Sequence, residues 1–203
     1  MYKLRDDLMV PEHDEHCYQA LIDQGDSVDR VLKHVKGRSL CVQAGGNFGV
    51  WPRKLAPLFE SVYTFEPDAL NFACLAWNTR DFENVYRFQA ALRGAAGFVG
   101  LDMTERERHN AGAYQVVKSG RIPSMCIDDF HLRSCDLIYL DIEGSEPLAL
   151  FGAQNTLRRF KPVLALEDKG IGDLAMRNKA FLLLHEIGYR QVDEVYKDKV
   201  LAC

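Results

Sequence analysis

The chain has 203 residues, of which 47% are apolar, and its 25 Lys and Arg are outnumbered by 29 Asp and Glu, for a net charge of −4. This size and apolar content fit one well-packed domain and exclude a disordered or collagen-like chain. The acidic balance argues against a dedicated nucleic-acid binder, because such binding depends on neutralising phosphates. No apolar run approaches the roughly 20 residues that span a bilayer, and residues 1–16 lack the apolar stretch of a secretory signal. We therefore expect a cytoplasmic domain without a membrane partner.

The cysteines and the first histidines do not indicate a metal site. The six cysteines form no C-x-x-C pair, and they lie at positions 17, 41, 74, 126, 135 and 203. Zinc sites and disulfide frameworks need closer or paired spacing, so we predict reduced thiols that are mostly small core residues. His13 and His16 lack a third ligand nearby in the sequence, which favours a solvated helix end over zinc.

In chain order, residues 1–36 are predicted to form a helical extension, with two short helices flanking Gly25. Residues 37–203 then alternate predicted strands with predicted helices and form the main domain. The strands are expected at 40–42, 61–65, 84–88, 137–140 and 163–166, the helices at 68–78, 147–160 and 174–187, and two closing strands at 189–193 and 195–202. This alternation is typical of an α/β fold with a doubly wound, mostly parallel sheet. Residues 93–123 interrupt it with a segment too long for a bare connection, which predicts an inserted hairpin or lid.

A glycine-rich turn follows the first strand of the main domain, in the sequence Ala44-Gly45-Gly46-Asn47-Phe48-Gly49. Glu66 ends the next strand, where an acid can accept the hydroxyls of a ribose. Neither the dinucleotide fingerprint nor a P-loop is present, which favours S-adenosylmethionine, a nucleoside cofactor without phosphate. Backbone amides of the turn would then meet the methionine carboxylate. The alternative is that the glycines only make a β–α turn, while Glu66 stabilises the helix that follows it.

A group of carboxylates follows the buried strand at 137–140, in the sequence Asp141-Ile142-Glu143-Gly144-Ser145-Glu146. Ligands in open α/β sheets bind beyond the carboxyl ends of the strands, so Asp141 and Glu143 are expected in that crevice. Glu167 ends the neighbouring strand and should face the same crevice. Crowded carboxylates can supply a base near neutral pH, which suits transfer of a methyl group to a hydroxyl. The alternatives are helix-dipole compensation for Glu146, solvation for Glu143, and a divalent ion held by the acids.

Five segments of the chain resemble the FkbM-type methyltransferase family, namely VQAGGNFG (42–49), FEPD (65–68), YLDIEGSE (139–146), LFGA (150–153) and PVLALED (162–168). The resemblance implies a Rossmann-like class I methyltransferase fold, with a seven-stranded, mostly parallel sheet that has an antiparallel closing strand. It also implies S-adenosylmethionine as cofactor and O-methylation, often of a sugar or a polyketide-like hydroxyl. By matching position, Gly45, Gly49 and Glu66 look like cofactor residues, and Asp141, Glu143 and Glu146 look like the active-site acids.

Further cofactor contacts are expected from Gln43, Gly46, Asn47 and Asp141, and from Gln89, which follows the third strand near the expected adenine position. Two positions depart from the family pattern. Gln43 stands where the family has an acid, and Tyr139 stands where it has a lysine.

The sequence therefore predicts an S-adenosylmethionine-dependent O-methyltransferase that acts on a small molecule or a glycan and needs no metal. Two alternatives stay open. The first is an inactive cofactor-binding or interaction protein, suggested by Gln43 and Tyr139. The second is an RNA 2′-O-methyltransferase, for which only Lys169 offers a lysine beside the acids. Two interpretations are open for four polar residues of the insertion, a lid over the acceptor or a solvated loop. These residues are Arg106, Arg108, His109 and Asn110.

Overall fold

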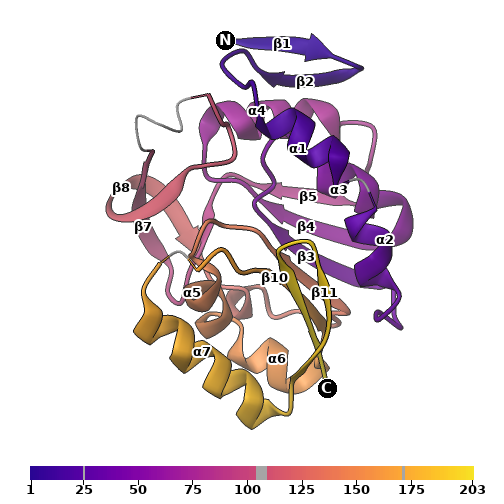
Figure 1. The fold of residues 1–203 in the computed structure, drawn as a ribbon, viewed down its shortest axis with the longest axis vertical. Helices are drawn as coiled ribbons and strands as arrows, with labels where there is room; N and C mark the ends of the chain where they lie inside the picture. The colour runs from indigo at the N-terminus through magenta and orange to yellow at the C-terminus, as the bar shows by residue number, and fades with distance from the viewer. Residues whose placement is uncertain (25, 104–108, 171) are drawn as a thin grey trace.

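A computed structural model describes residues 1–24, 26–103, 109–170 and 172–203 of the chain. Its centre is a seven-stranded sheet in the order β11-β12-β10-β9-β3-β4-β5 (Figure 1). The strands are β3 (Leu40–Ala44), β4 (Ser61–Phe65), β5 (Val85–Phe88), β9 (Leu137–Leu140), β10 (Val163–Glu167), β11 (Arg190–Val195) and β12 (Asp198–Ala202). β3, β4, β5, β9 and β10 pair in parallel, whereas β12 is antiparallel to both β10 and β11. The predicted α/β fold with an antiparallel closing strand is confirmed.

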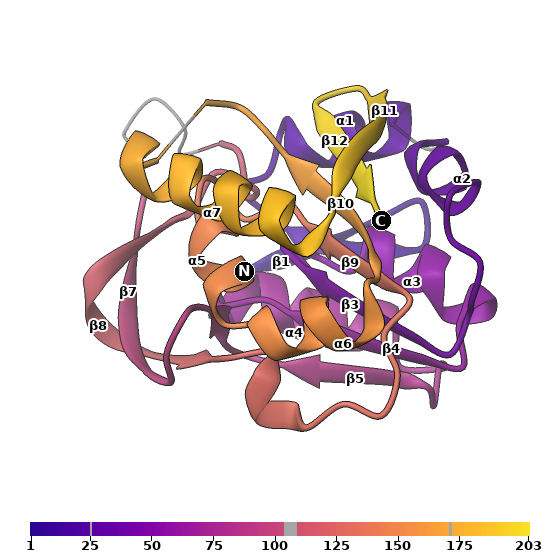
Figure 2. The same cartoon turned by 90° about the horizontal axis from the view of Figure 1, so that it is seen from below.

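Helices cover both faces of this sheet (Figures 1 and 2). One face packs against α2 (Ser27–Leu32), α3 (Val50–Leu55) and α4 (Ala69–Asn78), and the other against α5 (Glu146–Phe151), α6 (Gln154–Phe160) and α7 (Leu174–Ile187). Successive strand residues alternate between the two cores, as strand geometry requires. In β9, Leu137 and Tyr139 enter the first core, whereas Ile138 and Leu140 enter the second. Because both faces are buried, the central strands are apolar at nearly every position.

The N-terminal segment differs from the predicted helical extension, because it begins with a β-hairpin. β1 (Tyr2–Arg5) and β2 (Leu8–Pro11) pair across a turn in which Asp6 and Asp7 both have positive φ. The hairpin lies on α4, where the Asn78 side chain accepts from Met9 N and donates to Met9 O, both at 2.7 Å. The two predicted helices follow as α1 (Cys17–Asp23) and α2. The division into an extension and a main domain stays a prediction.

The insertion contributes to a three-stranded sheet in the order β6-β8-β7. β6 (Ala91–Leu92) lies just before the insertion, β7 (Gly97–Asp102) lies within it, and β8 (Gln115–Met125) extends two residues beyond it. β7 and β8 pair antiparallel, so the described part of the segment is a hairpin of the kind predicted. Short 3₁₀ turns lie at Ala56–Leu58 (η1) and Asp128–Phe130 (η3).

The helix predicted at 147–160 is divided into α5 and α6. The break lies at Gly152, where a Cβ atom would come within 2.1 Å of the Arg93 carbonyl oxygen. The insertion therefore approaches the chain too closely at this point for a larger residue. All six cysteines are unpaired, as predicted, and only Cys203 is exposed. No helix among the described residues is long and apolar enough to cross a membrane.

Candidate active site

A cavity of about 360 Å³ lies at the carboxyl ends of the parallel strands. Gly45 lines it after β3, Glu66 after β4 and Asp141 after β9, and Glu167 lines it at the end of β10. Four strands thus bring together residues that are far apart in the sequence, at the edge of the sheet where open α/β folds bind ligands. The volume lies within the range of about 300–1,000 Å³ that small-molecule sites occupy.

The glycine turn is packed tightly against the end of β9. Gly45 has a φ of +82°, and a Cβ atom there would lie 1.8 Å from the Asp141 carbonyl oxygen. The N–H groups of Gly45 and Gly46 both donate to the Phe65 carbonyl oxygen, at 3.2 and 2.9 Å. Only glycine allows this approach between the ends of three neighbouring strands.

The expectation that amides of this turn meet a ligand carboxylate is not supported. Each N–H group from residue 45 to residue 49 already has an acceptor within the chain. Beyond the two bonds to Phe65, Asn47 N donates to the Glu66 carboxylate, Phe48 N to the Asn47 side chain, and Gly49 N to Gly46 O. Gly46 and Gly49 build the turn against Leu75 and are not among the residues that line the cavity. Asn47 does line it, and its side chain donates to Cys17 Sγ at 3.1 Å.

Glu66 links the turn to the start of α4. Its Oε2 accepts from Asn47 N at 2.7 Å, and its Oε1 accepts from Asp68 N at 2.8 Å. The residue is only 5% exposed, and this burial raises the pKa of its carboxyl to about 7. Each carboxylate oxygen keeps a further lone pair, so Glu66 can also accept from hydroxyls in the cavity.

Two further residues predicted to touch a cofactor also lie outside the cavity lining. Gln43 is fully buried beneath the turn, where its Nε2 donates to Gly45 O at 2.9 Å and its Oε1 accepts from Thr64 Oγ1 at 2.6 Å. Gln89 is exposed and does not line the cavity. The wall at this place is formed instead by the apolar residues Ala90, Ala91 and Leu92.

The acids after β9 and β10 form a cluster with a lysine. Ligand oxygens of Asp141, Glu143 and Glu167 lie within 4.8 Å of one another. Lys169 Nζ donates to Glu143 Oε1 at 2.7 Å and lies 2.8 Å from Glu167 Oε1. Glu143 adopts a positive φ of 52° and is followed by Gly144 at +88°. This bend in the chain carries the Glu143 side chain to the cavity.

Glu167 is the acid whose protonation differs most from that of a free carboxyl. Burial, together with the hydrogen-bonded carboxyl of Asp141, raises the pKa of Glu167 to about 9. Two adjacent carboxylates resist simultaneous ionisation, so the Glu167 carboxyl keeps its proton near neutral pH.

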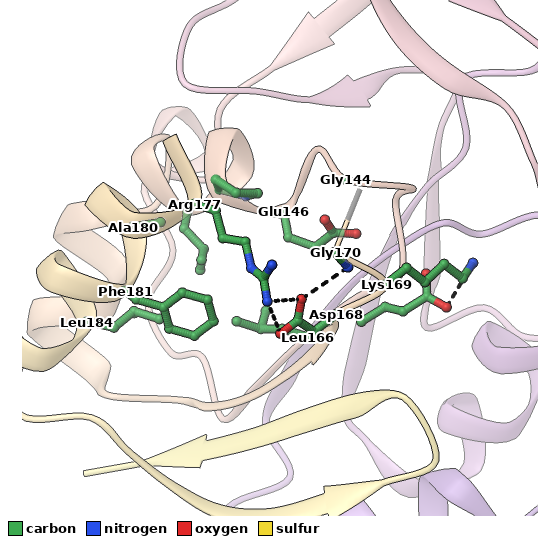
Figure 3. A pocket seen from close by; sticks show the side chains of 13 residues that line it. Gly144, Glu146, Leu166, Asp168, Lys169, Gly170, Arg177, Ala180, Phe181 and Leu184 are labelled. Atoms are coloured by element: carbon green, nitrogen blue, oxygen red, sulfur yellow. Dashed lines mark hydrogen bonds and ion pairs between the residues drawn. The ribbon is translucent and has the colours of Figure 1, made fainter. Parts of the chain in front are cut away.

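Glu146 is buried and lies outside the lining of the main cavity, and its role among the active-site acids stays a prediction. Its Oε1 accepts from Ile142 N at 2.9 Å, and burial raises the pKa of its carboxyl to about 7. It lines a separate cavity of about 30 Å³ beside α7, near Gly144 and across from Arg177, which pairs with Asp168 (Figure 3). Glu146 therefore shapes the loop that carries Glu143.

Tyr139 is also removed from the cavity. It is 2% exposed, and its hydroxyl donates to the Asp198 carboxylate. Asp198 is itself buried, and this burial raises the pKa of its carboxyl to about 6. The tyrosine thus joins β9 to β12 within the sheet.

The cavity is roofed by α1 and by residues 110–116 of the insertion. Asp14 connects the two parts, because its fully buried carboxylate accepts from Cys17 N, Tyr18 N and Ala111 N at 2.9–3.1 Å. Asn71 of α4 donates to Ala111 O at 2.7 Å. Asn110 belongs to this roof, whereas His109 contacts Glu15 at 3.5 Å near the surface. Arg106 and Arg108 lie outside the described residues.

Asn71 and Asp14 were not among the predicted site residues. Lys169 was placed beside the acids by its position two residues after Glu167, directly beyond a buried strand. Nothing local in the sequence indicated that Asp14 would meet Ala111.

Comparison with known proteins identifies the family. Residues 43–190 match the model of the methyltransferase FkbM domain. The chain belongs to the FkbM methyltransferase family. Among curated proteins, none matches the chain.

Solved structures support the same fold. The FkbM methyltransferase from Methylobacillus flagellatus KT is 18% identical, with a TM-score of 0.56. That alignment covers 84% of this chain and 45% of the other, so this chain spans about half the length of that relative. TYW2 from M. jannaschii, solved in complex with AdoMet (S-adenosylmethionine), is 11% identical with a TM-score of 0.50, and the alignment covers 100% of this chain and 83% of the other. The class I methyltransferase fold and the family predicted from the sequence are confirmed.

Proposed function

We propose that this FkbM-family protein is an S-adenosylmethionine-dependent O-methyltransferase that acts on a hydroxyl of a small molecule or a glycan. The observation that carries the proposal is the single cavity that joins Gly45, Glu66 and Asp141 at the ends of neighbouring strands. Membership of a methyltransferase family supports it further.

The residues present fit an adenosyl sulfonium. Glu66 offers lone pairs to ribose hydroxyls, and Ala90, Ala91 and Leu92 offer an apolar wall for a flat base. Asp141 and its neighbouring acids balance a positive sulfonium at the other end of the cavity. The close approach of Gly45 to Asp141 keeps the turn from filling this space. When bound, S-adenosylmethionine supplies an electrophilic methyl group.

The acids of this chain would hold the acceptor and take its proton. A hydroxyl becomes a better nucleophile as its proton passes to a nearby carboxylate. Glu143 reaches the cavity and is kept near Lys169, so we assign it the binding or deprotonation of the acceptor. Asp141 lies closest to the glycine turn, so we place it beside the reacting methyl group. Orientation of the acceptor along the line of displacement is the remaining task of the cavity wall.

Binding and turnover measurements test this proposal. Isothermal titration calorimetry should detect micromolar binding of S-adenosylmethionine or S-adenosylhomocysteine, and binding of neither would contradict the cofactor assignment. Release of S-adenosylhomocysteine with a panel of methyl glycosides and small alcohols then measures transfer. Asp141→Asn and Glu143→Gln should lower turnover much more than cofactor affinity. Cofactor binding without turnover on any hydroxyl would favour the inactive, cofactor-binding alternative.

A further inference from the structure

Lys169 follows β10 and lies among the acids that line the cavity. Its ammonium group lies between two carboxylates of the cavity, 2.7 Å from Glu143 and 2.8 Å from Glu167. Its side chain is 27% exposed and lines the same cavity as Asp141. Figure 3 shows Lys169 at the end of β10 with one of these ion pairs. The side chain is thus turned back over the acids.

The three acids have the spacing of ligands around one cation. Their oxygens lie within 4.8 Å of one another. Oxygens bound to one divalent ion at about 2.0–2.6 Å are separated by at most about twice that distance. Since Nζ of Lys169 contacts two of the three acids, the ammonium lies where such an ion would lie.

We propose that the ammonium group of Lys169 occupies the cation position of the acceptor site, between Asp141, Glu143 and Glu167, where a divalent ion would otherwise bind. The role in catalysis that follows from this position rests on the proposed function. An ammonium has three N–H donors, and the described contacts with Glu143 and Glu167 use two of them. The remaining donor is available to an acceptor oxygen in the cavity.

This arrangement assigns Lys169 a direct role in methyl transfer, as a hydrogen-bond donor to the acceptor oxygen. The acceptor oxygen forms its bond to the methyl carbon while the bond from that carbon to sulfur breaks, and the electron pair of that bond stays on sulfur. The hydroxyl proton passes to a carboxylate, for which Glu143 is placed. A fixed ammonium stabilises the negative charge that develops on the oxygen before the new bond is complete.

Manganese binding tests the inference without knowledge of the acceptor. Mn²⁺ is titrated at pH 8 into the wild type, Lys169→Met, Lys169→Arg and the double variant Lys169→Met/Glu143→Gln, and free Mn²⁺ is followed by electron paramagnetic resonance. S-adenosylhomocysteine binding and circular dichroism are measured on each protein, and Lys169→Gln replaces the Met variant if that variant does not fold. We expect the Kd for Mn²⁺ to fall at least tenfold, from above about 1 mM to about 0.1 mM, in Lys169→Met. The Arg variant should behave like the wild type, and the double variant should lose the gain.

Two results would overturn the inference. One is Mn²⁺ binding to the wild type as tight as that to Lys169→Met, since the ammonium would then not hold the position. The other is a folded Met variant that does not bind Mn²⁺ more tightly, since the acids would then not form one cation position. Failure of the wild type to bind S-adenosylhomocysteine contradicts the proposed function instead, and the manganese titration stays interpretable.

Discussion

Replacing Gly45 with alanine tests how the candidate site is assembled. Gly45 has a φ of +82°, and its new Cβ atom would lie 1.8 Å from the Asp141 carbonyl oxygen, which belongs to the backbone and cannot rotate away. The left-handed conformation costs a non-glycine residue about 1–2 kcal/mol. Forcing extra volume into a packed site adds about 1–3 kcal/mol. We therefore expect Gly45→Ala to lower the free energy of unfolding by about 2–5 kcal/mol, a large part of the roughly 5–15 kcal/mol typical of a domain.

Gly188→Ala is the matched control, because Gly188 has a φ of +108° and no atom within 4 Å of the added Cβ. Gly188→Ala should lower the free energy of unfolding only by the roughly 1–2 kcal/mol that the left-handed conformation costs a non-glycine residue. Thermal unfolding separates the two, since about 1–3 kcal/mol corresponds to roughly 2–12 °C in a chain of this size. Gly45→Ala should also weaken S-adenosylhomocysteine binding at least tenfold, whereas Gly188→Ala should not. Equal destabilisation by the two variants would refute the close contact between the turn and β9.

Three further predictions concern the roof, the cofactor wall and pH. Asp14→Ala should cost about 3 kcal/mol of unfolding free energy because it leaves buried N–H groups without an acceptor, and amide hydrogen exchange should accelerate around Ala111. Gln89→Ala should leave the Kd for S-adenosylhomocysteine within about twofold, whereas Glu66→Gln should raise it at least about tenfold, as calorimetry can verify. The folded pKa values of Glu66 (about 7) and Glu167 (about 9) exceed those of the unfolded chain, so the folded state binds more protons and stability should fall as pH rises from 6 to 9. Urea unfolding should show this slope, and a Glu167→Gln variant that retains the full slope above pH 7.5 would contradict the assignment.

Most of the sheet could be predicted because its central strands are buried on both faces. Short apolar runs such as 137–140 and 163–166 identify strands without help from distant parts of the chain. The apolar runs also identified Glu66 and Asp141 as candidate site residues, since each is the first charged residue after a buried strand. The carboxyl ends of parallel strands meet at one edge, so these residues had to lie close together.

Other features depend on contacts that a local pattern does not contain. The hairpin at 2–11 turns on Asp6 and Asp7, which lack the glycine that usually marks such a turn. The predicted helix breaks at Gly152, which lies against the carbonyl of Arg93, a contact between residues far apart in the sequence. Gln89 was expected in the cavity because of its place after β5, yet the chain turns so that Ala90 is buried and Gln89 is exposed.

The acids after β9 illustrate the same limit within one short segment. Asp141, Glu143 and Glu146 are equally polar, so their types alone did not separate their roles. The positive φ of Glu143 directs one side chain to the cavity, and the start of α5 turns Glu146 back toward the amide of Ile142. Backbone direction decided which acid lines the cavity.

The bond between Asp14 and Ala111 has a consequence for how the protein reaches its binding-competent state. These residues are 97 positions apart, so during synthesis the cavity stays open until the ribosome has released more than half of the chain. The pairing of Cys41 with Leu137 in the centre of the sheet joins a stretch of nearly the same length, so the roof and the sheet both depend on distant contacts. Both form slowly compared with the neighbouring helices and hairpins, and a ligand that binds only the finished cavity would stabilise the completely folded chain.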